Sequence, residues 1–367
     1  MCHVPAVGLW LVTRWADVEQ AAMDAVRFPA AVPGSPLDAT LGGVNVLTVD
    51  GDAQRRLRAP MEPTLRPRAV EARAPALLGE LAGRLLDGLA PQGAAELMTE
   101  YLEPLSVLSL AELIGLGGDL DVPTLVGWFA GLVRGTSNFE GDPGKQALAD
   151  ATSADIDARL RPRLEGLLEQ PDGSLVSELL ASVEGDLDAR LAAVMPTLKL
   201  VLIGGLQEPG HGAGSTLLGL LSDPGQAAAF AANPAGLARD AVEEGLRWIS
   251  PIGTQTRAAG VGARLSGTDI PHDAAVGLVV SSANRDPRVW GEDADRYRLD
   301  RPRRPHAAFG FGPHFCIGHH LARVQDRIAV RMAFQRLPGL RLDPDRPARV
   351  RGWEYRAPAC LPVRWDA

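Results

Sequence analysis

The sequence predicts a mainly α-helical protein with a small β region, and three observations support this fold class. From residue 69 to residue 192, apolar side chains recur at three- and four-residue spacings, the period of amphipathic helices. The stretch Met195–Leu221 is long and apolar, and as one helix it would span about 40 Å. Residues 261–280 and 340–363 instead alternate as short strands with turns between them.

The elements follow one another in a clear order. Gly8–Arg14 predicts a strand and Trp15–Ala25 a helix, and Arg27–Asn45, rich in proline, glycine and alanine, predicts a long loop. Near the end of the chain, Leu321–Leu337 predicts one more helix. The central helical region divides into segments separated by proline, glycine and aspartate: Leu77–Leu89, Ala94–Leu116, Thr124–Val133, Lys145–Leu168 and Gly173–Ser182.

Composition and charge exclude several classes of protein. The 367 residues carry a net charge of −8, which argues against a nucleic-acid partner. Cys2, Cys316 and Cys360 make no even disulfide framework, which favours a reducing compartment. The N-terminus lacks a secretory signal, and the most apolar internal run, Leu198–Leu206, is too short to cross a bilayer. With no repeat and no linker, we expect one cytoplasmic domain, 1–367, that does not contact a membrane.

One short stretch carries the strongest chemical signal. Phe309–Gly318 reads FGFGPHFCIG and places Cys316 among glycines and aromatics. A cysteine thiolate is one of the few side chains that binds haem iron. A buried cysteine is more often just a small apolar residue, but this run matches the haem-thiolate signature F-G-x-G-x-H-x-C-x-G of the cytochrome P450 family. It does so at every fixed position: Phe309, Gly310, Gly312, His314, Cys316 and Gly318.

The resemblance implies the cytochrome P450 fold, with haem b between a long distal helix and the cysteine loop. Cys316 would be the iron ligand, and Arg58, Arg257 and His314 would bind the haem propionates. Arg58 matches the arginine of the family's His-x-x-x-Arg pair, but Gln54 stands where the histidine is usual. The alternative for Arg58 is a solvated helix face, since exposed arginines are common.

The long helix departs from the family pattern at its midpoint. Gly204-Gly205-Leu206 resembles the small-Gly-x part of the motif that opens the oxygen-binding groove, but Gln207 and Glu208 replace the usual acid and threonine. Pro209 follows and should kink the helix. In this resemblance Glu208 would carry protons in place of the alcohol, with its pKa raised by burial. Alternatively, Glu208 turns away into a structural salt bridge. His211 shares its helix face, either as a partner or as an ordinary histidine.

Two further segments match the family in order. Glu244-x-x-Arg247 resembles the ion-pair anchor of the proximal core, joined by Arg301, and its role would be structural. In Ser250–Arg257, the residues Ile252, Gly253 and Thr254 would lie near the substrate. Phe129, beside Trp128, is a further candidate for the pocket, although apolar side chains at helical spacing are more often core residues.

The resemblance therefore implies an enzyme that inserts one oxygen atom into a small hydrophobic organic substrate, by hydroxylation or by O- or N-dealkylation. In the favoured hypothesis, a ferredoxin and its reductase supply electrons, and Arg56, Arg323 and Arg327 contribute to the docking surface. In the second, the protein uses peroxide, with Glu208 as acid and base. In the third, it binds haem without oxidising anything. The sequence does not identify the substrate.

Overall fold

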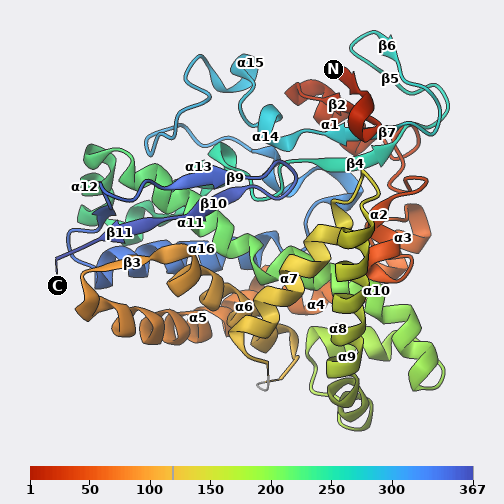
Figure 1. Ribbon diagram of the computed structural model, residues 1–367, viewed down its shortest axis with the longest axis horizontal. Helices are drawn as coiled ribbons and strands as arrows, with labels where there is room; N and C mark the ends of the chain where they lie inside the picture. The colour runs from red at the N-terminus through yellow and green to blue at the C-terminus, as the bar shows by residue number, and fades with distance from the viewer. Residues whose placement is uncertain (118–119, 367) are drawn as a thin grey trace.

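Helices make up most of the computed structural model, which describes residues 1–117 and 120–366 (Figure 1). The longer ones are α1 (Trp15–Met23), α3 (Gly51–Arg58), α5 (Pro67–Leu89), α6 (Glu103–Ile114), α7 (Val122–Thr136), α8 (Pro143–Glu169), α10 (Leu187–Leu206), α11 (Glu208–Leu221), α12 (Pro224–Ala232), α13 (Pro234–Trp248) and α16 (His319–Arg336). The shorter ones are α2 (Pro36–Leu41), α4 (Glu62–Leu65), α9 (Leu175–Ala181), α14 (Val280–Ala283) and α15 (Pro287–Trp290). These elements confirm the predicted mainly α class.

The strands form small sheets at two sides of the helical body (Figure 1). The largest has the order β1-β2-β7-β4, with β2 and β7 parallel although they lie far apart in the chain. Its strands are β1 (Cys2–Val4), β2 (Leu9–Val12), β7 (Ala275–Leu278) and β4 (Gln255–Ala258). The others are β3-β11-β8 (Ala94–Glu96, Pro362–Arg364, Arg341–Leu342), β9-β10 (Arg349–Arg351, Ala357–Cys360) and β5-β6 (Arg264–Leu265, Thr268–Asp269).

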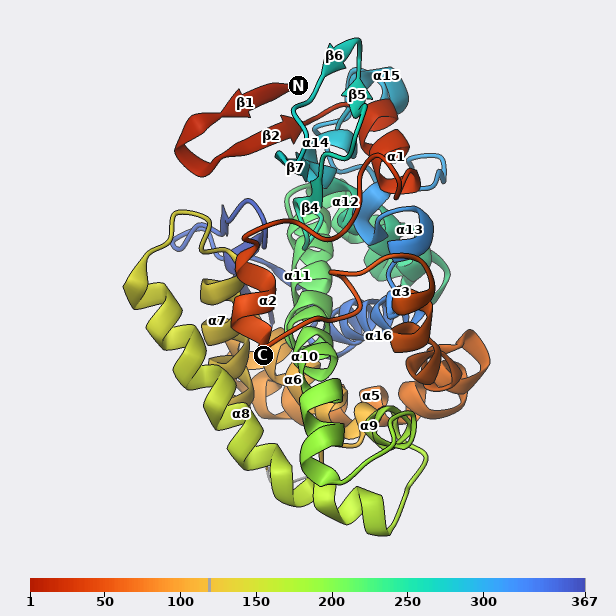
Figure 2. The ribbon, with the colours of Figure 1, turned by 90° about the vertical axis from the view of Figure 1, so that its right-hand side faces the viewer.

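Helices α10 and α11 run end to end through the middle of the molecule (Figure 2). The single predicted helix over Met195–Leu221 is therefore corrected in two ways: the helical stretch begins at Leu187, and it is broken at Gln207, whose φ and ψ are −119° and −23°. Pro209 lies in the first turn of α11. Backbone N–H groups in the first turn have no acceptor within the helix, so a proline there removes no hydrogen bond. The proline thus starts a new helix instead of kinking one.

The stretch Leu187–Leu221 is long and apolar enough to span a membrane by length and composition. In the structure it is an interior element instead, because 56% of its most apolar window is buried. Leu198, Leu202 and Leu206 of α10 pack into one hydrophobic cluster with α6 to α8, and Leu217 of α11 packs into another with α5, α13 and α16. The central helices thus join two hydrophobic cores.

Two predicted elements are wrong in detail. The helix predicted over Ala94–Leu116 begins instead as strand β3, which pairs with β11 at the far end of the chain. A π-helical turn, Met98–Leu102, separates β3 from α6. The loop predicted over Arg27–Asn45 contains helix α2, in which the Ser35 hydroxyl accepts a hydrogen bond from the backbone N–H of Leu37.

Candidate active site

The cysteine loop is held in shape by its own backbone. The N–H of Cys316 donates to the carbonyl oxygen of Phe309 over 2.9 Å. Gly310 and Gly312 have φ values of +71° and +66°, which favour glycine, and a Cβ on Gly312 would lie 2.8 Å from the carbonyl oxygen of Ala22. This loop therefore needs glycine at both positions, as the signature predicts.

The environment of the Cys316 thiol fits a metal ligand. Burial raises its pKa, while backbone N–H groups of Gly318 and His319 and the charges of Arg58 and Arg323 oppose the shift. The protein alone therefore does not favour a thiolate at Cys316. A bound metal ion deprotonates a coordinating thiol outright, so iron would supply the charge that the burial of this group otherwise opposes.

Arg257 is the clearest sign that a carboxylate ligand fits beside this loop. Its side chain is buried and donates only to the carbonyl oxygen of Thr256, over 2.8 Å. Among the described residues, no acidic oxygen lies within 4.0 Å of its guanidinium. Burial lowers its pKa to about 10, and Asp50 opposes that shift. A buried charge without a partner is costly, and a haem propionate would supply the missing one.

His314 and Arg58 lie in the same electrostatic neighbourhood. Nε2 of His314 is 2.8 Å from Oδ1 of Asp50, and its Nδ1 is buried with no hydrogen-bond partner. Burial lowers the pKa of His314, Arg257 and Arg58 add to the shift, and Asp50 opposes it. Arg58 is only loosely paired, with its Nε 3.7 Å from Oε1 of Glu62. The structure thus brings together the three side chains predicted to bind propionates.

Gln54 has a different contact from the one its position suggests. Its side chain is buried, and Nε2 donates to the carbonyl oxygen of Pro313 over 3.0 Å. The amide therefore ties α3 to the cysteine loop at Pro313, the residue directly before His314. The amide nitrogen of Gln54 therefore already has a hydrogen-bond acceptor within the protein.

The two glycines of the central helix differ in their surroundings. A Cβ on Gly205 would lie 2.7 Å from Cδ1 of Leu110 in α6, so this glycine allows the helices to pack closely. A Cβ on Gly204 would meet no atom within 4 Å, and this residue is exposed. Gly204 therefore faces open space, whereas Gly205 serves helix packing.

Glu208 begins α11 directly after the break at Gln207. Both residues are buried, and neither carboxyl oxygen of Glu208 has a hydrogen-bond partner. Nδ1 of His211 lies 3.7 Å from its Oε1, and that nitrogen is also without a hydrogen bond. Glu208 therefore forms no arginine or lysine salt bridge within the described structure. Unpartnered buried carboxyls are costly, and such groups often have a functional role.

Aromatic side chains lie next to His211, the neighbour of this acid. The ring of Phe129 lies edge-on to His211, with centroids 5.7 Å apart, and edge-on to Tyr355, at 6.1 Å. Tyr355 pairs through its backbone with Ile252, and its hydroxyl lies 3.1 Å from Oγ1 of Thr136. Phe129, Ile252 and Glu208 are thus brought to one place. Trp128 is held elsewhere, since its Nε1 donates to Asp155 of α8 over 2.7 Å.

The neighbouring residue Gly253 has a structural reason to be glycine. Its N–H donates to the carbonyl oxygen of Glu354 over 2.7 Å, and a Cβ would lie 2.0 Å from the carbonyl oxygen of Trp353. Sequence reasoning missed Glu354 and Tyr355. The only local signal was an acid and a tyrosine in a segment expected to form hairpins, and nothing in it indicated packing against α7.

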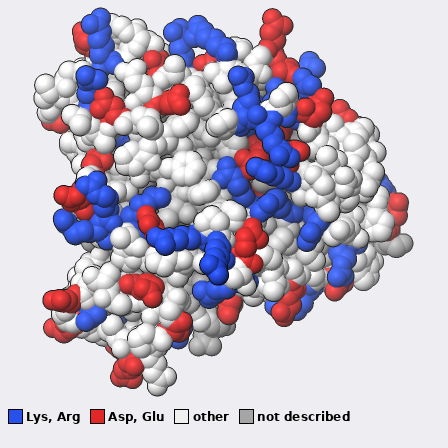
Figure 3. Space-filling view, turned by 180° about the vertical axis from the view of Figure 1, so that it is seen from behind, with Lys and Arg blue, Asp and Glu red and all other residues white. Residues whose placement is uncertain are grey.

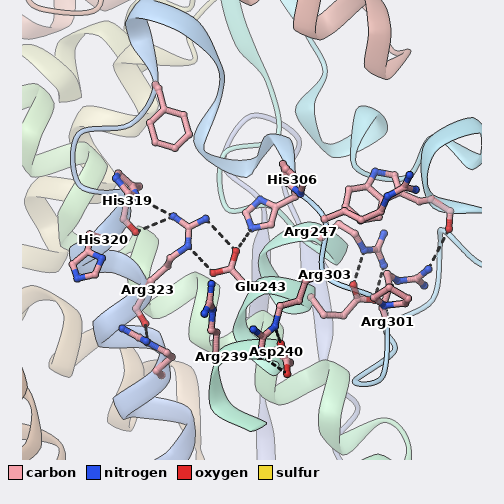
Figure 4. Close-up of a pocket in the computed structure, with 17 residues that line it drawn as sticks. Arg239, Asp240, Glu243, Arg247, Arg301, Arg303, His306, His319, His320 and Arg323 are labelled. Atoms are coloured by element: carbon pink, nitrogen blue, oxygen red, sulfur yellow. Dashed lines mark hydrogen bonds and ion pairs between the residues drawn. The ribbon is translucent and has the colours of Figure 1, made fainter. Parts of the chain in front are cut away.

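Ion pairs support the cysteine loop from behind (Figure 4). The predicted Glu244–Arg247 pair is bidentate, with both contacts 2.7 Å, and Arg301 joins it at 2.9 Å. A second group was not predicted: Glu243 contacts both Arg323 and His306, at 2.6 and 3.1 Å. The guanidinium of Arg323 also lies 4.3 Å from the ring centre of Phe309.

The described residues contain no cluster of three or more histidine, cysteine, aspartate or glutamate side chains that would hold a metal ion by themselves. A single cysteine, together with a buried arginine that has no carboxylate partner, suits a metal within a larger group that supplies the other ligands and its own carboxylates. Haem b is such a group.

The chain is similar to known proteins over nearly its whole length. A family model described as "Cytochrome P450" matches residues 236–339, which include the cysteine loop. The chain is 30% identical to 6-deoxyerythronolide B hydroxylase of Saccharopolyspora erythraea, covering 97% of this chain and 90% of that one. It is 31% identical to vitamin D(3) 25-hydroxylase of Pseudonocardia autotrophica, covering 92% and 83%.

Solved structures agree with these sequences. P450BioI, in complex with an acyl carrier protein ligated to hexadec-9Z-enoic acid, has a TM-score of 0.86 at 27% identity and covers 97% of this chain and 92% of that one. A myxobacterial cytochrome P450 in complex with myristic acid has a TM-score of 0.87 at 27% identity, covering 98% and 90%. The chain therefore belongs to the cytochrome P450 family and is a bacterial-type monooxygenase with haem b as its cofactor.

Proposed function

We propose that this monooxygenase hydroxylates, or O- or N-dealkylates, a small hydrophobic organic molecule with electrons from a ferredoxin and its reductase. The observation that carries the proposal is the position of Cys316 near Arg58, Arg257 and His314, three side chains that could each pair with a carboxylate of a bound group. A cytoplasmic location belongs to the same proposal, because the redox partners of such an enzyme would be found there.

In this proposal each residue has a defined role toward haem. Cys316 ligates the iron, and Arg257, Arg58 and His314 pair with the propionates. Gly204 leaves room on the distal side, and Gly205 lets α10 lie against α6. Haem held by the Cys316 thiolate would supply the chemistry of oxygen activation.

Glu208 is the residue that moves protons. It stands where the resemblance implies an alcohol, and both of its carboxyl oxygens are buried without a hydrogen bond. A carboxyl in this state accepts a proton at one oxygen and returns one from the other without first breaking a contact. Nδ1 of His211, 3.7 Å from Oε1, lies within reach of small side-chain movements and would hold the carboxyl in orientation.

The proposed docking surface for the ferredoxin lies behind the cysteine loop. A hollow of about 660 Å³ opens there, next to Phe315 and His319. Basic side chains gather on the rear face of the molecule (Figure 3). The hollow is lined by seven arginines against three acids: Arg239, Arg247, Arg301, Arg303, Arg304, Arg323 and Arg327, with Asp240, Glu243 and Glu244. Such a surface attracts an acidic partner.

The three arginines predicted for docking differ in availability. Arg323 is engaged by Glu243, and Arg327 donates to the carbonyl oxygen of Arg323. Arg56 is exposed, with no acidic oxygen within 4.0 Å among the described residues. Arg323 therefore supports the cysteine loop first, and the exposed arginines of the hollow would carry most of the docking.

One observation favours a second candidate, a peroxide-driven oxygenase. The free carboxyl of Glu208 would take a proton from one oxygen of hydrogen peroxide and return it to the other, so that the O–O bond breaks, one oxygen leaves as water and the other is transferred to the substrate. Hydrogen peroxide already carries the two electrons that a ferredoxin would otherwise deliver, so no redox partner is needed.

The experiment compares two oxidants on the haem-loaded protein with a panel of methoxy-aromatics. The proposal expects turnover with NADH, ferredoxin and reductase, and much slower turnover with hydrogen peroxide alone. Fast peroxide turnover that the electron donors do not improve would favour the second candidate. Absence of product with either oxidant, in a protein whose reduced carbon monoxide spectrum shows intact thiolate ligation, would leave a haem protein without oxygenase activity.

A further inference from the structure

The C-terminal hairpin region closes against the end of α7. The hydroxyl of Tyr355 lies 3.1 Å from Oγ1 of Thr136, and the ring of Trp353 lies 6.3 Å from that of Phe139. Glu354 lies between these two contacts in the chain, and its carboxyl meets the Ser137 hydroxyl. The residues of this junction come from segments more than 200 positions apart, and together they form one wall beside Phe129 and Ile252.

The Glu354 carboxyl has no counter-charge in this wall. Its Oε2 is buried and has no hydrogen-bond partner. Burial raises the pKa of Glu354 to about 7, and the Ser137 hydroxyl opposes that shift. No arginine, lysine or histidine nitrogen lies within 4.0 Å of it in the described part of the chain. The nearby Arg356 instead donates to the carbonyl oxygen of Gly352.

A second acid without an arginine or lysine partner, Glu208, lies within electrostatic reach of Tyr355. Burial raises the pKa of Tyr355, and the carboxyls of Glu354 and Glu208 both add to this. The phenol ring thus stands within electrostatic reach of two carboxyls, neither of which is paired with an arginine or lysine. A molecule resting against Phe129 and Tyr355 would meet an apolar surface with acid groups at its edge.

We propose that the substrates of this enzyme carry a protonated amine, and that Glu354 receives the ammonium group at the wall between α7 and the C-terminal hairpin. The inference rests on the proposed function, because it concerns the substrate of the same site. An ammonium N–H would donate to the free Oε2, and such a charge-assisted bond is stronger where water is excluded. The apolar part of the substrate would lie toward Phe129 and Ile252. Glu354 is then a specificity-determining residue and takes no part in the oxidation.

The test measures ligand affinity and needs no turnover. Three ligands of similar size are titrated into haem-loaded protein by calorimetry at about pH 8: dimethyloctylamine, the branched hydrocarbon with carbon in place of its nitrogen, and octanoate. The two methyl groups on nitrogen disfavour its coordination to iron. The variants are Glu354→Gln, which keeps shape and loses charge, and Glu354→Asp, which keeps charge. The matched control is Glu140→Gln, an exposed acid of the α7–α8 loop that pairs with Lys145.

The wild type should bind the amine about tenfold or more tightly than the hydrocarbon, with octanoate weakest. Glu354→Gln should abolish that preference, Glu354→Asp should keep part of it, and Glu140→Gln should keep all of it. Equal affinities in the wild type, a preference that survives in Glu354→Gln, or its loss in both Gln variants would overturn the proposal. Failure of the proposed function would show separately, as missing product from a protein that still prefers the amine.

Discussion

At the scale of single residues, the site is defined by buried ionisable groups that lack partners. Arg257 is buried without a carboxylate, both carboxyl oxygens of Glu208 are buried without a hydrogen bond, and Oε2 of Glu354 is likewise buried without one. Burying such groups does not stabilise the fold, because an unpaired buried charge costs several kcal/mol. In the function proposed above, a propionate would pair with Arg257, and protons or substrate would reach the two acids.

Replacing Arg257 tests this explanation. We expect Arg257→Met to release haem at least about tenfold faster, because a charge-assisted contact worth about 1.5–3 kcal/mol is lost. The haem-free protein should be as stable as the wild type or more stable, because an unpaired buried charge has been removed. Haem transfer to apomyoglobin and urea unfolding of the haem-free protein measure the two effects.

Arg264→Met is the matched control, since Arg264 is exposed and pairs with Asp269 in the β5-β6 hairpin. It should change neither quantity. If Arg257→Met destabilised the haem-free protein and left haem release unchanged, Arg257 would be a structural residue and not a propionate partner.

Some of these residues were predictable and others were not, for a physical reason. Cys316 and His314 lie in a contiguous motif whose glycines are required by backbone geometry, so the sequence alone identifies them. Asp50, which binds Nε2 of His314, lies 264 positions away. Glu354 likewise becomes important only because the chain folds back against α7. Contacts between distant segments leave no local pattern.

At the scale of elements, helix packing distinguishes the two adjacent glycines of α10. Gly205→Ala should destabilise the protein by about 1–3 kcal/mol, because the new methyl group would overlap Cδ1 of Leu110. Gly204→Ala should leave the haem-free protein unchanged or stabilise it by up to about 1 kcal/mol, because alanine favours helices and meets no atom here. Chemical denaturation of both haem-free variants measures the difference, and equal effects would contradict this assignment.

The contact between α13 and α16 has a predictable pH dependence. Burial opposes ionisation of Glu243, but His306 and Arg323 outweigh it and lower its pKa to about 2. A depressed carboxyl pKa stabilises the fold above its unfolded value of 4.5, and this contribution disappears as the pH falls toward 2.

Glu243→Gln should therefore lower the free energy of unfolding by up to about 3 kcal/mol at neutral pH. The difference from the wild type should narrow as the pH falls from about 5 to about 3, and urea unfolding of the haem-loaded proteins at several pH values would show this. Glu71→Gln, at an exposed acid that contacts His320 and Arg327, is the control and should have little effect. A difference that stayed constant with pH would refute the pairing.

Helix α10–α11 shows the limit of prediction for an element. Periodicity indicates a long apolar helix, and this is correct for most of its length. The break at Gln207 was read as a kink, because proline within a helix and proline in the first turn of a new one look alike in sequence. A different ambiguity affects Ala94–Leu116. Its apolar residues have helical spacing, but pairing with β11 makes its first residues a strand.

At the scale of the whole molecule, segments far apart in the chain close the fold. Strand β2 pairs with β7, and β3 pairs with β11, so both ends of the chain are tied into sheets (Figure 1). The fold class can be predicted from composition, periodicity and a resemblance, but these pairings between distant strands cannot. They also place the C-terminal hairpin over α7, and so determine the wall that contains Glu354.

The basic hollow behind the cysteine loop predicts electrostatic docking. Arg239 is exposed, and no acidic oxygen lies within 4.0 Å of it among the described residues. Arg239→Glu should raise the KM for ferredoxin several-fold and leave kcat nearly unchanged, and the wild-type KM should rise with salt. Arg349→Glu, on strand β9, is the charge-matched control and should have no such effect. Steady-state kinetics over a range of ferredoxin concentrations would distinguish the two.

The most direct test of the central claim measures the rate of product formation and the substrate affinity of the wild type, Glu208→Gln and Glu103→Gln. Glu103 is the control because burial also raises the pKa of its carboxyl and it too lies near His211. If Glu208 carries the protons, Glu208→Gln should form product about 100-fold more slowly with substrate affinity unchanged. Glu103→Gln should behave like the wild type. Equal product formation by Glu208→Gln and the wild type would contradict the account.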